Sequence, residues 1–142
     1  MYPKLWLPFL NSAQLSNLPG HCAEYMRYVQ KSSRRLARSI FHQMIRYQKK
    51  LEAKQSILNR IVDIGTDLFA ISAVCSYADH LFKKEPGKTN ALLLADLFCR
   101  ETQNRIKLLF QKEKSNTDKE NIAVARKLMA KEFEWMENEI IK

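Results

Sequence analysis

The spacing of apolar side chains between residues 55 and 82 constrains the fold of this chain more than any other feature. These side chains recur at strictly alternating intervals of four and three, at Ile57, Ile61, Ile64, Leu68, Ile71, Cys75, Ala78 and Phe82. Such a spacing places them in one stripe along an α-helix. A second apolar row lies beside that stripe, at Leu58, Val62 and Phe69. A helix with two apolar rows is expected to pack against two neighbours, which predicts a helical bundle.

Three further stretches have a helical period, at about residues 22–50, 89–112 and 118–141, beside the one at about 53–83. The first repeats apolar residues from Val29 to Leu51. The third places Leu94, Phe98, Ile106 and Leu109 on one side, and the fourth aligns Ile122, Ala125, Met129, Phe133, Met136 and Ile140. Short connections between long helices favour antiparallel neighbours. We therefore predict an all-α, up-down four-helix bundle over residues 22–142, preceded by an irregular apolar leader at 1–21.

The cysteines and the apolar runs indicate the cellular compartment of the protein. Cys22, Cys75 and Cys99 are odd in number, widely spaced and form no CxxC, so they indicate neither a disulfide framework nor a zinc site. No continuous apolar run approaches the roughly 18 residues that span a bilayer. The leader segment LWLPFL is too short for a cleaved signal peptide. These features predict a cytoplasmic protein, with peripheral attachment to the inner face of the membrane left open.

A charged stripe follows the helix at 53–83, where Arg60, Asp63 and Asp67 are spaced three and four apart. A di-iron bundle would need Glu-x-x-His pairs, and no histidine here has an acid three residues before it. No phosphate loop, GxSxG or HExxH occurs either. Arg105 falls inside the apolar stripe of the third helix, one turn after Glu101. We therefore predict ion pairs between helices, with Arg105 buried and bonded to Glu101, Asp63 or Asp67, in preference to a catalytic or metal site.

Three runs of sequence carry a family resemblance: SSRRLARSIFHQM, KLEAKQSILNRIVDIGTDLFA and LLLADLFCRETQNRI. Together they resemble the C-terminal helical domain of the very-long-chain type acyl-CoA dehydrogenases, particularly the bacterial members. The similarity runs from about Lys31 to Ile106 and continues more weakly through EFEWMENEI. Those enzymes oxidise fatty acyl-CoA thioesters in β-oxidation with FAD and a glutamate base, both held in a larger preceding region.

The resemblance implies a noncatalytic accessory domain. No residue of this chain matches the family's flavin-binding or catalytic-base motifs, so no catalytic, cofactor or metal residue is expected here, and FAD is implied only for a catalytic partner. In the family this domain packs on the catalytic region, contributes to dimer architecture and is implicated in membrane association. The opposing hypothesis is a self-sufficient, flavin-binding relative of the dehydrogenases. Whether the chain is a split subunit, a remnant or an excised domain stays open.

The strongest remaining signal is charge. Residues 27–54 hold nine of the 24 basic residues and one acid, Glu52. Five of them are expected to face outward and contact an anionic surface, such as a membrane or an acidic partner: Arg34, Arg35, Arg38, Lys49 and Lys50. Nucleic acid is not expected, because Phe41 and Tyr47 fall with the apolar stripe and no nucleic-acid motif occurs. The alternative is a solvated face partly covered by acids of the last helix, at Glu132, Glu134, Glu137 and Glu139.

The leader contains six large apolar side chains, at Tyr2, Leu5, Trp6, Leu7, Phe9 and Leu10. Left in water together they would form an apolar patch. We expect the leader to fold back onto the bundle. Docking into a partner's groove or a membrane interface is the alternative.

Overall fold

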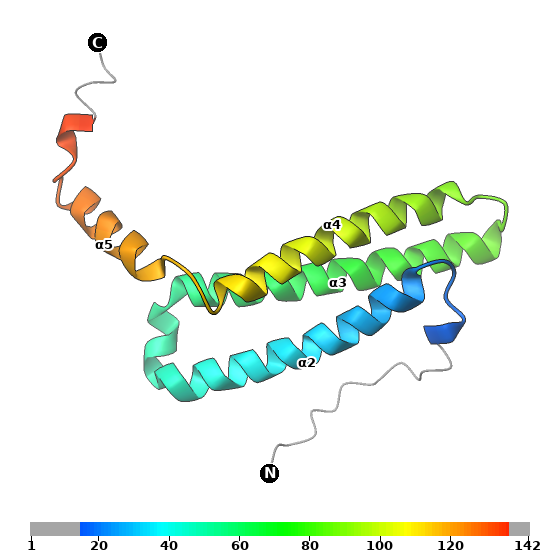
Figure 1. Cartoon of the computed structure of the whole chain (residues 1–142), viewed down its shortest axis with the longest axis horizontal. Coiled ribbons are helices and arrows are strands. Elements are labelled where there is room, and N and C mark those ends of the chain that lie inside the picture. Colours follow the sequence, from blue (N-terminus) through cyan, green and yellow to red (C-terminus); the bar gives the residue numbers. More distant parts are fainter. Residues whose placement is uncertain (1–14, 137–142) are drawn as a thin grey trace.

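The structure, a computed structural model, describes residues 15–136, apart from the side chains of Glu52 and Ala53. It contains α2 (Cys22–Tyr47), the 3-10 helix η1 (Gln48–Ala53), α3 (Gln55–Lys84), α4 (Asn90–Lys112) and α5 (Asp118–Met129). Between residues 15 and 136 there is no β-strand. The prediction of an all-α helical bundle is confirmed (Figure 1).

The helix α3 lies at the centre and packs against both α2 and α4, which touch each other at far fewer positions. Its buried side chains include Ile64, Leu68, Ile71, Cys75 and Ala78, all from the predicted stripe. Ile57, Ile61 and Phe82 of that stripe are half-buried. The prediction that this helix packs on two neighbours is therefore confirmed. Residues 85–89 turn the chain, so α4 returns antiparallel along α3 (Figure 1).

The buried face of α4 differs from the predicted one. It consists of Ala95, Cys99, Thr102, Ile106 and Phe110. The expectation that Leu94 and Phe98 face the interior is wrong, because their exposed fractions are 69% and 39%. Ile106 is buried as expected. Small side chains at Ala95 and Cys99 let the backbone of α4 approach α3 closely, which leaves the larger leucines outside.

The helix α2 is buried mainly in its first half. Cys22, Tyr25, Met26 and Ser32 are buried there, and Val29 and Leu36 pack against the core. Towards its end Phe41, Met44 and Ile45 are exposed. The helix ends at Tyr47, where Gln48 adopts a positive φ of 45° and η1 begins. The predicted apolar stripe is thus covered at its start and open at its end.

The helix α5 ends earlier than predicted, at Met129 in place of residue 141, with Lys131 in a left-handed conformation at φ 60°. None of its residues is buried. Ile122, Met129 and Met136 of the expected stripe are exposed, so their assignment to the core is wrong. Figure 1 shows α5 continuing away from α2, α3 and α4. Ile140 lies outside the described residues, as does the leader up to residue 14.

By length and composition α3 could cross a membrane, since an 18-residue window within it has a mean hydropathy of 1.4. The uncharged run in this helix is bounded by Asp67 and Asp79, so the expectation that no continuous apolar run approaches roughly 18 residues stands beside this average. One third of that window is buried, so packing between α2 and α4 accounts for part of its apolar composition. The remainder includes Val62, Phe69 and Tyr77, which are exposed on α3.

Candidate partner-binding surface

A charged pair joins α3 to α4 in the middle of the bundle. The Nε of Arg105 donates a hydrogen bond to Oδ2 of Asp67 at 2.7 Å, and its Nη2 donates to Oδ1 of the same carboxylate. The Asp67 side chain is only 7% exposed, whereas that of Arg105 is 62% exposed. The expectation that Arg105 is buried is therefore wrong: the carboxylate is the buried member. The hydrogen bond to Asp67 raises the pKa of Arg105 above its ordinary value.

The other predicted acids stand outside this pair. Asp63 is exposed and adds an attractive charge that also raises the pKa of Arg105. Glu101 is exposed on α4, one turn before Arg105. The structure thus brings Asp67 and Arg105 into direct contact, places Asp63 close enough to act through its charge, and leaves Glu101 at the surface.

Arg60 pairs with a residue that sequence spacing did not connect to it. Its Nη2 donates to both carboxylate oxygens of Asp118, at 3.0 and 3.2 Å. Both side chains are largely buried in this contact. Asp118 is the first residue of α5, where a carboxylate is favoured by the helix dipole. The pair attaches the start of α5 to α3, although the rest of α5 is exposed.

The sequence patterns also did not predict the polar contacts between α2 and α4. The hydroxyl of Tyr25 donates to Oδ1 of Asp96 at 2.7 Å, and Arg100 pairs with the other oxygen of Asp96. The bond from Tyr25 holds the pKa of Asp96 below its ordinary value, while burial raises the pKa of Tyr25. Further along, Ser39 donates to Glu113 at 2.6 Å. Only the Asp96–Arg100 spacing of four was visible in the sequence, because Tyr25 lies 71 residues away.

Two hollows lie at the surface. One, of about 390 Å³, is at the end where α2 and α4 begin, and is lined partly by His21, Cys22, Tyr25, Asn90 and Asp96. The other, of about 300 Å³, lies between α2 and α3 and is lined mostly by apolar side chains such as Leu36, Ile40, Leu68 and Phe69. Across residues 15–136 no group of three or more His, Cys, Asp or Glu side chains is placed to hold a metal ion.

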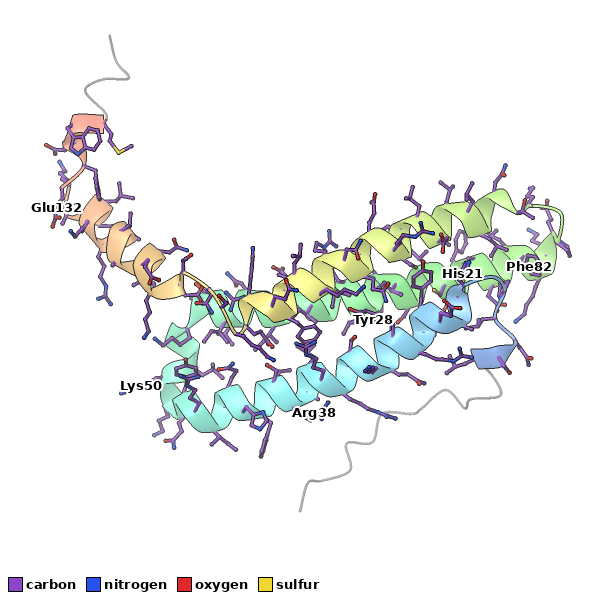
Figure 2. The ribbon with its side chains drawn as sticks, in the orientation of Figure 1. His21, Tyr28, Arg38, Lys50, Phe82 and Glu132 are labelled. Carbon is purple, nitrogen blue, oxygen red and sulfur yellow. The ribbon has the colours of Figure 1, made fainter. Side chains whose placement is uncertain are left out.

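The five basic residues expected at an anionic surface, Arg34, Arg35, Arg38, Lys49 and Lys50, are all exposed. Arg35 also packs over the ring of Phe110, with its guanidinium carbon 4.0 Å from the ring centre. Two of the acids expected to cover them are engaged locally, since Glu132 pairs with Lys127 and Glu134 with Lys131. Figure 2 shows Glu132 beyond α5, well apart from Arg38 and Lys50. Glu137 and Glu139 lie outside the described residues.

Apolar side chains form an exposed strip on α4. Leu93, Leu94, Leu97 and Phe98 are exposed and recur at intervals that place them on one helical face, opposite Ala95 and Cys99. We call these four residues the outer face of α4. Isolated exposed leucines are ordinary, but a contiguous apolar face of this kind is typical of a surface that binds another protein.

Comparison with known proteins decides the family. Residues 22–135 match the family described as ACAD9/ACADV, C-terminal domain. This chain belongs to that family. The resemblance inferred from sequence is confirmed. No solved structure matches the chain.

The curated relatives of this ACAD9/ACADV C-terminal domain are much longer proteins. Proteins named "Probable acyl-CoA dehydrogenase FadE10", from Mycobacterium bovis and Mycobacterium tuberculosis, are 39% identical over 143 aligned residues. The alignment covers 96% of this chain but only 22% of each relative. The chain therefore spans about a fifth of the length of these relatives, and it matches the family described as a C-terminal domain.

Proposed function

We propose that this chain is a noncatalytic accessory domain of an acyl-CoA dehydrogenase in fatty acid β-oxidation, and that it acts by packing against the FAD-dependent catalytic region. The outer face of α4 is the observation that carries this proposal. Most of each relative's sequence lies outside the part that matches this chain. That remaining part would offer a large surface against which this domain can pack. FAD and the catalytic base belong to that partner.

The energetics favour such packing. Fully burying a leucine-sized side chain contributes about 1.5–3 kcal/mol relative to exposure. Leu93, Leu94 and Leu97 are each more than half exposed, so covering the outer face would contribute several kcal/mol before the costs of association. The long-range contacts of Asp67 with Arg105 and of Tyr25 with Asp96 hold α4 in a fixed position, which presents this face as a preformed surface.

The direct test is complex formation with a catalytic region. Purified chain would be mixed with a FadE10-type dehydrogenase truncated before its C-terminal domain, and complex formation measured by size-exclusion chromatography with light scattering. Leu94→Glu together with Leu97→Glu should abolish the complex. Lys31→Glu, at an exposed site of α2, makes the same change of two charge units without touching the outer face and should leave the complex intact. Binding unaffected by the leucine changes would contradict the proposed surface.

The same purified chain also tests two alternatives to packing on a catalytic region. A second copy of the chain on the outer face would give a homodimer that the leucine changes dissociate, visible in the light-scattering mass of the chain alone. A flavin-type visible absorption spectrum of the purified chain would favour the self-sufficient enzyme. Neither outcome depends on a partner being identified correctly.

A second function is favoured by the exposed basic residues of α2 and η1. We propose that Arg34, Arg35, Arg38, Lys49 and Lys50 bring the assembly to an anionic membrane surface from the cytoplasmic side, as a peripheral contact. Each Lys or Arg near such a surface contributes about 1 kcal/mol. The support is their shared exposure and the separation of Glu132 from Arg38 and Lys50 in Figure 2. No contact with nucleic acid is proposed.

A further inference from the structure

The three cysteines, far apart in sequence, meet at one place in the bundle. Cys22 comes from α2, Cys75 from α3 and Cys99 from α4, and all three are free and buried. The sulfurs of Cys75 and Cys99 are 3.8 Å apart. Cys22 and Cys75 lie close enough that each affects the pKa of the other. Cys75 therefore contacts Cys99 directly and lies near Cys22.

The three thiols differ in their access to solvent. Cys75 and Cys99 have no exposed surface, whereas Cys22 retains 4% and lines the hollow of about 390 Å³ at the end of the bundle. Figure 2 shows His21, the preceding residue, at that end, where α2 begins. A small solute that enters this hollow would meet the Cys22 sulfur first.

The environment also favours Cys22 as the first thiol to react. Cys22 is the first residue of α2, and a helix N-terminus stabilises a thiolate. The interaction with Cys75 lowers the pKa of Cys22, although burial and the charges of Asp79 and Asp96 oppose this. The pKa of Cys75 is raised by Cys22, by Cys99 and by burial, so Cys75 stays a protonated thiol. Its place near Cys22 and in contact with Cys99 makes it the second thiol to react.

We propose that these cysteines form an oxidation relay, in which hydrogen peroxide oxidises Cys22 and the final product is a Cys75–Cys99 disulfide that joins α3 to α4. A sulfur–sulfur bond is about 2 Å long, so the two sulfurs must approach each other by rotation of their side chains. Because Cys75 and Cys99 come from different helices, the product restrains α3 relative to α4.

The relay has three balanced steps. The Cys22 thiolate attacks one peroxide oxygen, the O–O bond breaks, and the departing hydroxide takes a proton to become water, which leaves a sulfenic acid. The Cys75 thiol then attacks the Cys22 sulfur, its proton passes to the sulfenic oxygen as the S–O bond breaks, and a second water leaves. Finally the Cys99 thiolate attacks the Cys75 sulfur and Cys22 departs as a thiolate. Two thiols are oxidised, and the peroxide is reduced to two waters.

The test uses the full chain, reduced and then treated with hydrogen peroxide. Trypsin cleaves after Lys83, Lys84 and Lys88, so Cys75 and Cys99 fall on different peptides. Mass spectrometry without reductant should find these two peptides linked, with the intact chain lighter by two hydrogen atoms. The melting midpoint should rise by about 5 °C on oxidation and return with dithiothreitol. Absence of a disulfide, or an unchanged or lowered midpoint, would overturn the proposal.

Variants separate the steps. Cys22→Ala should slow formation of the Cys75–Cys99 disulfide by tenfold or more, and oxidation at the wild-type rate would overturn the relay. Cys99→Ala should stop the reaction at a Cys22–Cys75 disulfide, which would trap the intermediate; failure to form it would also count against the relay. Circular dichroism before oxidation identifies any variant that does not fold, and Cys→Ser changes at the same positions then replace it.

Discussion

The Asp67 carboxylate, buried on α3, accepts two hydrogen bonds from Arg105, whose guanidinium reaches it from the surface of α4. The energetic roles in this pair are therefore unequal. Removing Arg105 leaves a buried carboxylate without its partner, whereas removing the charge of Asp67 leaves a cation that water can solvate.

This asymmetry sets the first prediction. Arg105→Met should destabilise the bundle by about 2–3 kcal/mol, because a buried charge that loses its partner is costly. Asp67→Asn should cost less, on the order of 1 kcal/mol. Urea denaturation of the two variants measures which change lowers the free energy of unfolding more. This order is the reverse of the one that a buried arginine would give, so a larger cost for Asp67→Asn would mean that the cation is the poorly solvated member.

The second prediction concerns acid stability. The pKa of Asp96 is lowered first by the hydrogen bond from Tyr25 and also by the charge of Arg100. A carboxyl group whose folded pKa is depressed contributes stability above its unfolded pKa of about 3.9, and loses it as the pH falls through the folded value. Tyr25→Phe should therefore raise the pKa of Asp96 and weaken the loss of stability below about pH 4, besides costing about 1 kcal/mol at neutral pH.

NMR titration of the Asp96 carboxyl and urea midpoints at acidic and neutral pH measure both effects. Tyr77→Phe is the matched control, because Tyr77 is exposed on α3 and stacks on His80. Equal acid sensitivity of the wild type and Tyr25→Phe would show that this hydrogen bond does not govern the acid limb.

The third prediction concerns α5. Because Arg60 attaches Asp118 to α3 while α5 itself is exposed, Arg60→Ala should increase amide exchange in α5 roughly fivefold, equivalent to about 1 kcal/mol, with little change in α4. Hydrogen exchange with mass spectrometry localises the effect. Lys83→Ala, which breaks an exposed pair with Asp79 within α3, should leave α5 unchanged. Similar exchange in both variants would argue against the attachment.

The sequence predicts the buried face of a helix well only where the two faces of that helix differ strongly in hydrophobicity. In α3 the stripe from Ile64 to Ala78 was predictable because its large apolar residues sit at a strict helical interval. In α4 apolar residues occur on both sides, and the inward side is marked by Ala95, Cys99 and Thr102, which carry a weaker hydrophobic signal than Leu93 and Leu94. Periodicity shows that a helix has an apolar face, but it does not show whether this chain or a partner covers that face.

The ion pairs show a similar limit. Spacing placed Arg105 inside the apolar stripe of its helix, but the long arginine side chain lets its charged end lie outside while the backbone faces inward. The partnership of Arg60 with Asp118 depends on where α5 starts in space, and that of Tyr25 with Asp96 joins segments 71 residues apart. Such contacts depend on the packed arrangement of the helices, so no local sequence pattern predicts them.

The last prediction tests the basic face on α2 and η1. Arg35 packs on Phe110, so reversing it would disturb packing as well as charge. Arg38, Lys49 and Lys50 are exposed, and their joint change to Glu should abolish binding to vesicles that contain anionic lipid without lowering the melting midpoint. Each basic residue contributes about 1 kcal/mol near such a surface.

Salt provides the independent check. Charges interact across about 8 Å at physiological ionic strength and about 3 Å at 1 M, so vesicle binding of the wild-type chain should fall steeply between these conditions, and neutral vesicles should not bind. Co-sedimentation measures binding to anionic vesicles at physiological salt, binding to them at about 1 M salt, and binding to neutral vesicles. Wild-type protein that ignores anionic vesicles at low salt would eliminate the membrane contact. A triple variant that melts early would show that these side chains stabilise the bundle itself, and the exposed basic face would then be a solvated part of the fold.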